Sequence, residues 1–165
     1  PRALPQRTVC MAILLAAVMA ASAAFSPLLH ASSWLGLQPS AQSLDNKVVI
    51  VDVFTFDCIN CKHVVPELRA LHAALPSSHF AIIGIHSPET PFERDRGNVV
   101  QNLKAQGITW PVAVDNDFVL WRAYGIEYWP TQLIFDRHGH LRKTIVGEGQ
   151  DAVVAATVRA LLSER

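Results

Sequence analysis

Two cysteines separated by two residues are the most informative chemical feature of the chain. Cys58 and Cys61 follow the hydrophobic run 48–54 and open a stretch with helical apolar periodicity. They are therefore expected where a buried strand ends and a helix begins, and a helix N-terminus stabilises a thiolate through its unpaired N–H groups and its dipole. Cys61 comes one turn later on the same face. The spacing predicts a redox pair in which Cys58 attacks a disulfide and Cys61 resolves the mixed disulfide.

Cysteines at this spacing also bind metal, so a zinc or copper site is the first alternative. Zinc needs two further ligands, and the only other cysteine, Cys10, lies at the start of an apolar N-terminal stretch. A non-catalytic metal-binding module would have to recruit a distant histidine such as His138 or His140. The seven histidines show no metal-ligand spacing with one another. We therefore expect no metal, and no cofactor other than a redox-active disulfide between Cys58 and Cys61.

Strands and helices alternate around the cysteine pair, which predicts an α/β fold with a mixed sheet and helices on both faces. Runs of β-branched residues indicate strands, and apolar residues three and four apart indicate helices. The predicted strands are 48–54, 80–86, 112–114, 132–135 and 141–146. The predicted helices are 58–75, a capped segment that begins at 90 and resumes at 98–106, 118–124 and 151–162.

The N-terminal part has the composition of an export or anchoring segment. No charged residue occurs from Val9 to Leu29, and Arg2 and Arg7 precede this apolar run. Basic residues on that side favour a cytoplasmic N-terminus, so the chain after the apolar run is expected to cross the membrane. The small residues 21–24 suit signal cleavage, whereas the length of the run suits a retained anchor, which we favour.

The chain is accordingly predicted to have an N-terminal apolar helix in a membrane anchor or signal segment at 1–31, a linker at 32–46 and a globular domain at 47–165. We expect a periplasmic or other extracytoplasmic location, with anchoring by residues 9–29. The first residue is Pro rather than Met, so further segments are expected upstream. The 14 basic and 14 acidic residues balance, and no basic patch indicates a nucleic-acid partner.

The order of a strand, the Cys58-x-x-Cys61 helix and a later Trp129-Pro130-Thr131 before a hairpin resembles the thioredoxin fold. Cys-Ile-Asn-Cys together with residues 115–116, 128–130 and 147–149 is more closely similar to the exported, membrane-tethered TlpA-like and DipZ-like thiol-disulfide oxidoreductases. The resemblance covers roughly 44–162. It implies that an inserted helix and strand follow residue 90.

The resemblance also implies roles for residues around the cysteines. Pro130 is expected to be cis and to lie against them, with Trp129 and Thr131 beside it, so that the backbone of Trp129 pairs with an extended substrate segment. The alternative for this segment is an ordinary tight turn. Asp52, on the central strand, matches a buried acid beneath the thioredoxin active site. Burial would raise its pKa and let it accept the proton of Cys61.

Further acids and bases leave the direction of the reaction open. Glu89 comes after the second strand, where the resemblance implies an acid near the thiols, although a solvated loop glutamate is an equal alternative. Asp57 puts a negative charge beside Cys58 and disfavours its thiolate. Lys62 and His63 act in the opposite sense if they lie close.

The expected function is that of an exported enzyme that reduces or exchanges disulfides in extracytoplasmic proteins. The resemblance implies disulfide-bearing exported proteins as substrates, apocytochrome c in cytochrome c maturation among them, and a membrane-embedded electron donor, separate or fused upstream. A thiol peroxidase of peroxiredoxin type is an alternative, because Thr55-Phe-Asp-Cys58 matches part of that motif. The proline that the motif also needs is replaced by Val51.

Overall fold

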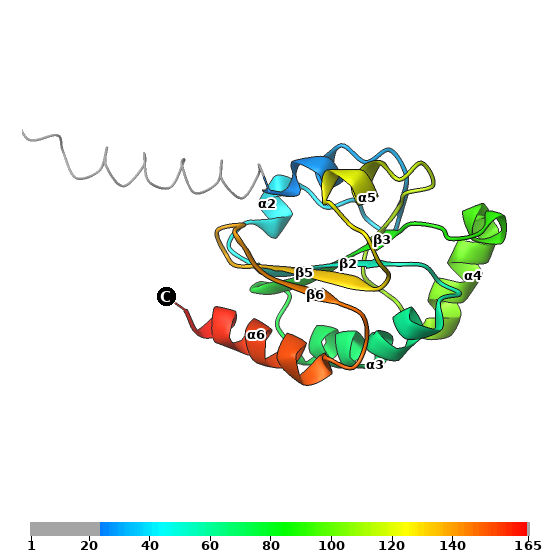
Figure 1. The fold of residues 1–165 in the computed structure, drawn as a ribbon. Coiled ribbons are helices and arrows are strands. Elements are labelled where there is room, and N and C mark those ends of the chain that lie inside the picture. Colours follow the sequence, from blue (N-terminus) through cyan, green and yellow to red (C-terminus); the bar gives the residue numbers. More distant parts are fainter. Residues whose placement is uncertain (1–23, 165) are drawn as a thin grey trace, which may run out of the picture.

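A computed structural model describes residues 24–164 of the chain (Figure 1). The predicted apolar helix and the greater part of the predicted anchor, residues 9–23, lie outside the described residues. Within 24–164, no helix combines the length and the hydrophobicity that crossing a bilayer requires.

The described residues form one six-stranded mixed sheet with the strand order β1-β4-β3-β2-β5-β6. The strands are β1 (Trp34–Leu35), β2 (Val48–Phe54), β3 (Phe80–His86), β4 (Val112–Val114), β5 (Thr131–Phe135) and β6 (Leu141–Val146). The helices are α2 (Ala41–Leu44), α3 (Ile59–Ala74), the 3-10 turn η1 (Pro91–Arg94), α4 (Arg96–Gln106), α5 (Val119–Ala123) and α6 (Asp151–Ser163). β2, β3 and β4 are parallel, and the remaining pairs are antiparallel.

Strand β2 lies in the middle of the sheet, and all seven of its residues are buried. This is what a continuous run of β-branched residues requires when helices cover both faces of a sheet. In Figure 1, α3 and α6 lie below the sheet, and α2 and α5 lie above it. Each face has its own apolar core. The predicted thioredoxin-like mixed sheet is confirmed.

The capped segment after β3 differs from its prediction in one respect. The helix expected from residue 90 is a short 3-10 turn, η1, and α4 begins separately after Asp95. Asp95 is the N-cap of α4, since its side chain accepts a hydrogen bond from the Asn98 N–H at 2.9 Å. The helical segment therefore breaks at Asp95, two residues before the glycine at position 97.

The region predicted as a linker, 32–46, packs against the domain. Trp34 and Leu35 form β1, which pairs antiparallel with β4, and Leu44 at the end of α2 is buried. Residues 24–29 are helical, and Phe25 packs edge-on against Phe135 with ring centroids 5.1 Å apart. The apolar core on the α5 side of the sheet, called here the second core, includes Phe25, Leu28 and Leu44. The upstream segment therefore belongs to the folded domain and differs from the predicted linker.

Candidate active site

Cys58 and Cys61 lie at the start of α3, where β2 leads into the helix. Cys58 is the N-cap of α3, and its Sγ accepts a hydrogen bond from the backbone N–H of Cys61 at 3.3 Å. That N–H is one of the donors that a helix N-terminus leaves without a backbone partner, so its hydrogen bond stabilises a thiolate on Cys58. Both side chains are free thiols in this structure.

The two thiols differ sharply in exposure. Cys58 is partly exposed, whereas Cys61 is 2% exposed and belongs to the core beneath α3. Burial, followed by the hydrogen bond with Cys58, raises the pKa of Cys61 far above its ordinary value. Cys58 is therefore the thiol that an incoming disulfide can reach, and Cys61 keeps its proton until a base removes it.

Asp52 occupies the buried position predicted for it. Its residue is 1% exposed, on the face of β2 that α3 covers. Burial raises the pKa of Asp52 to about 7, and a hydrogen bond from Gln132 Nε2 to Asp52 Oδ1 at 3.2 Å partly offsets this. The carboxyl also interacts electrostatically with Cys61. A group that titrates near neutral pH next to a buried thiol has the properties of a proton acceptor.

The Trp129–Pro130 peptide bond is cis, as the resemblance implies. The indole of Trp129 is held from two sides: Nε1 donates to the Ser87 carbonyl at 3.0 Å, and the ring lies 4.4 Å from that of Trp121. Trp129 also packs against the core that contains Cys61. Among residues 24–164, no hydrogen bond is formed by the backbone of Trp129, so its N–H and C=O remain available to an extended segment.

Thr131 lies beside this loop, but its side chain is turned inward. It is buried, and its hydroxyl donates to the Tyr128 carbonyl at 2.7 Å. The neighbouring Gly147 N–H donates to the Pro130 carbonyl at 2.8 Å. Thr131 therefore shapes the loop from within rather than offering its hydroxyl to a partner.

The acid brought to the active-site loop is Glu93, whereas Glu89 has the exposure of the solvated loop glutamate that was its alternative. Glu89 is exposed, and its carboxylate makes no hydrogen bond with any described residue. Glu93 is 1% exposed and accepts hydrogen bonds from the Thr55 hydroxyl and from the Asp57 N–H at 3.2 Å. The sequence does signal Glu93, but only as the capping-box residue of the segment after Thr90.

Charged residues next to the cysteines along the chain form exposed ion pairs. Lys62 Nζ pairs with Asp57 Oδ1 at 2.9 Å, so the negative charge next to Cys58 is compensated. His63 Nδ1 contacts Glu148, in the loop between β6 and α6. These pairs are exposed, and salt screens them.

The histidines proposed as distant metal ligands lie at the wrong end of the sheet. His138 and His140 are in the turn after β5, whereas Cys58 comes after the opposite end of β2, which pairs antiparallel with β5. The five residues of β5 separate the two ends by roughly 13 Å. No cluster of three or more potential metal ligands occurs among residues 24–164, and these histidines cannot complete a site with the thiols.

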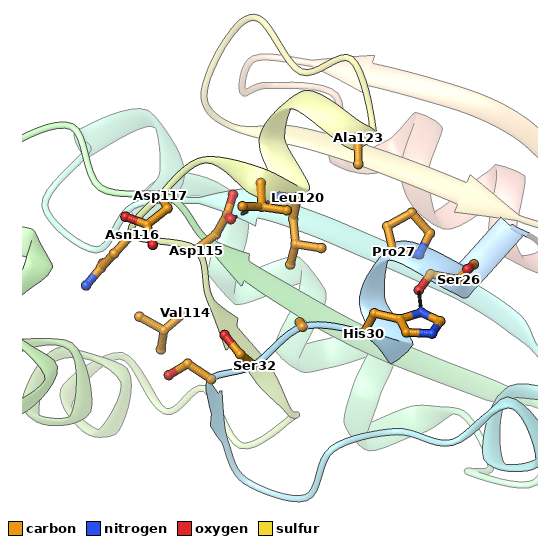
Figure 2. Close-up of a pocket in the computed structure, with 13 residues that line it drawn as sticks. Ser26, Pro27, His30, Ser32, Val114, Asp115, Asn116, Asp117, Leu120 and Ala123 are labelled. Carbon is orange, nitrogen blue, oxygen red and sulfur yellow. Dashed lines mark hydrogen bonds between the residues drawn. The ribbon is translucent and has the colours of Figure 1, made fainter.

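A pocket of about 670 Å³ lies apart from this site, between residues 26–33 and 114–123 (Figure 2). Its lining contains neither cysteine nor the Trp129–Pro130 loop. Asp115 in its wall is already engaged, because it accepts hydrogen bonds from the Leu120 N–H, the Trp121 N–H and the Ser87 hydroxyl. The pocket is thus distinct from the thiol chemistry.

Comparison with known proteins matches residues 29–144 to the model of the AhpC/TSA family. Protein DipZ of Mycobacterium tuberculosis is 37% identical over 123 residues, which cover 74% of this chain and 18% of DipZ. The chain therefore spans about a fifth of the length of that relative. Thiol-disulfide oxidoreductase YkuV of Bacillus subtilis is 25% identical over 133 residues, covering 80% of this chain and 89% of YkuV.

Solved structures agree with this relationship. The crystal structure of a thiol-disulfide isomerase from Corynebacterium glutamicum superposes with a TM-score of 0.74 at 28% identity, and covers 83% of this chain and 95% of its own. A thioredoxin-like protein in its oxidised form gives a TM-score of 0.73 at 23% identity, which supports the fold alone.

Proposed function

Because the chain belongs to the AhpC/TSA family, we propose that it is a thiol-disulfide oxidoreductase of the thioredoxin type, with Cys58 as nucleophile and Cys61 as resolving thiol. The observation that carries this assignment is the unequal exposure of the pair. Cys58 is partly exposed at the N-cap of α3 and accepts the Cys61 N–H, while Cys61 is buried above a carboxyl that titrates near neutral pH.

The reaction proceeds from that geometry. The Cys58 thiolate attacks one sulfur of a substrate disulfide, so a mixed disulfide forms and the other substrate sulfur leaves as a thiolate. Asp52 accepts the proton of Cys61, whose sulfur then attacks Cys58. The Cys58–Cys61 disulfide forms and the second substrate thiolate leaves. Two electrons pass to the substrate, and the protein is oxidised to its disulfide form without any other cofactor.

Substrate binding is assigned to the Trp129–Pro130 loop. The free backbone groups of Trp129 suit an extended peptide that adds beside the loop as a strand adds to a sheet edge. The ring contacts of Trp129 with Trp121 and its hydrogen bond to Ser87 hold the loop in place for this. Backbone pairing of this kind depends little on the side chains of the substrate peptide, which fits an enzyme that acts on many disulfide-bearing proteins.

The proposed setting is extracytoplasmic, with exported disulfide-bearing proteins as substrates, apocytochrome c included. The support is the uncharged segment after Arg7. Since Phe25 and Leu28 are buried in the domain, residues 9–23 remain for the membrane anchor or signal segment. An oxidising compartment would require a membrane-embedded donor to return electrons to the pair.

The peroxidase alternative receives less support. Thr55 is fully buried, and its hydroxyl donates to Glu93, so it does not face a peroxide approaching Cys58. Hydrogen peroxide consumption coupled to thiol oxidation separates the two activities. We expect the reduced protein to reduce insulin disulfides much faster than it consumes peroxide.

The Cys61→Ser variant tests the role of each thiol. Its Cys58 should form mixed disulfides with a disulfide-bearing substrate that cannot be resolved, visible on non-reducing gels and released by dithiothreitol. Cys58→Ser is the matched control and should trap none. Trapping by Cys58→Ser alone would reverse the assignment, and a wild-type protein that never reduces insulin would refute the proposed activity.

A further inference from the structure

Glu93 connects the two loops that meet at the active site. Its Oε1 accepts hydrogen bonds from the Thr55 hydroxyl and the Asp57 N–H, in the loop that ends at Cys58. Its Oε2 accepts from the Glu89 N–H at 2.8 Å and the Thr90 N–H at 2.7 Å, in the loop after β3. One carboxylate thus fixes the residue next to the nucleophile against a second segment of the chain.

The charge of this carboxylate is retained and is not neutralised. Burial opposes its ionisation, but the hydrogen bonds from Thr55, Thr90, Glu89 and Asp57 outweigh burial and hold the pKa of Glu93 below its usual value. No ion pair among residues 24–164 includes Glu93.

The nearest titratable ring supplies no compensating positive charge. The His86 ring packs edge-on against Phe54 and stacks on Phe56, and its Nε2 is 3.4 Å from the Thr55 hydroxyl. Burial lowers the pKa of His86 to about 4, so the ring is neutral at pH 7. The contrast with Asp57 is direct, because the exposed Asp57 carboxylate is paired with Lys62.

We propose that Glu93 is a positioning residue whose buried, uncompensated negative charge disfavours the Cys58 thiolate and keeps the Cys58–Cys61 couple on the reducing side. This inference rests on the proposed function and adds the direction that the sequence left open. In such couples, whatever stabilises the thiolate of the nucleophilic cysteine stabilises the reduced form and makes the disulfide a stronger oxidant. A fixed negative charge held against the residue next to Cys58 opposes it, so the dithiol gives up its two electrons and two protons more readily.

The balance of the reaction can be measured against glutathione. The disulfide form and two glutathione thiols interconvert with the dithiol form and one glutathione disulfide. Replacing Glu93 by Gln keeps the shape and removes the charge. We expect the equilibrium constant at pH 8 to move about tenfold toward the dithiol, which is about 30 mV less negative in reduction potential. Alkylation of Cys58 by iodoacetamide should become about threefold faster.

Two controls separate charge from structure. Glu89→Gln removes the same charge four residues away on an exposed side chain and should leave the equilibrium within twofold of wild type. Glu93→Asp keeps the charge and should also stay within twofold, and it serves if Glu93→Gln does not fold. Thermal unfolding is measured alongside, since a purely structural role would lower stability without moving the glutathione equilibrium.

The failures are distinguishable. A wild-type protein that shows no glutathione-dependent interconversion of Cys58 and Cys61 would refute the proposed function itself. A normal wild-type couple with an unchanged equilibrium in folded Glu93→Gln would overturn only the role of Glu93. A tenfold shift in Glu89→Gln or in Glu93→Asp would overturn it as well.

Discussion

Gln132 on β5 lies directly opposite Asp52 on β2, and its Nε2 donates a hydrogen bond of 3.2 Å to Asp52 Oδ1 beneath the buried thiol. Gln132 is two residues after Pro130. The strand that begins at the substrate loop therefore also holds the carboxyl proposed to accept a proton from Cys61. Strand β5 thus connects the loop proposed to bind substrate with the carboxyl proposed to accept the proton.

Asp52→Asn should make the protein more stable above neutral pH. Because burial raises the pKa of Asp52 from 3.8 to about 7, the folded state holds more protons than the unfolded state between these values, and stability falls as pH rises through that window. Between pH 5 and pH 8, we expect the free energy of unfolding of the variant to rise relative to that of the wild type by roughly 2–3 kcal/mol. Urea unfolding measures this difference. A constant difference across this range would contradict the raised pKa.

Gln132→Leu should move the midpoint of the pH dependence to higher pH for the step in which Cys61 resolves the mixed disulfide. In the wild type, the hydrogen bond from Gln132 favours the ionised form of Asp52. Without this bond nothing opposes the effect of burial, so the pKa of Asp52 rises further above about 7. We expect decay of the mixed disulfide at pH 7 to slow roughly three- to tenfold, a cost of about 1 kcal/mol for one hydrogen bond. Stopped-flow decay rates from pH 6 to 9 test this, and an unshifted midpoint would count against the coupling.

Lys62→Met should reduce the reactivity of Cys58. The substitution leaves the Asp57 carboxylate next to Cys58 without its partner at 2.9 Å, so the thiolate meets an uncompensated charge. We expect iodoacetamide alkylation at low ionic strength to slow about threefold, and the difference to shrink in 1 M salt because exposed charges are screened. Lys104→Met, on α4, is the control. A salt-independent difference would indicate a change of conformation instead.

Leu28→Ala should destabilise the whole domain, although Leu28 lies in the segment predicted from sequence to be an anchor. The side chain is fully buried in the second core, and removing such a leucine costs about 2–5 kcal/mol. Leu37→Ala is the matched control, because Leu37 is 85% exposed. Chemical unfolding that showed equal effects for the two variants would remove this upstream segment from the folded unit.

Sequence alone identified the cysteine pair, the sheet and most element boundaries, because these depend on neighbours along the chain. Cys58 falls one residue before α3 as its cap, and the β-branched run 48–54 coincides with β2. The side chains of the two apolar cores follow patterns that are visible along the chain. Helices show an apolar period of about 3.6 residues, and central strands are continuous apolar runs. The same local patterns missed β1, since two residues carry too little periodicity to be recognised.

Tertiary structure decided which acid of the segment after β3 is buried against the loop that leads to Cys58. Glu89 and Glu93 are four residues apart, before and within η1, and the capping-box pattern that marks Glu93 does not tell that its side chain is buried. That depends on the approach of the loop after β3 to the loop after β2, where Thr55 and Asp57 supply donors from more than 30 residues away. The sequence determined that two thiols at a helix start would do redox chemistry. Only the packing of distant segments decided the charges around them, because electrostatic interactions depend on distance in space and burial rather than on order along the chain.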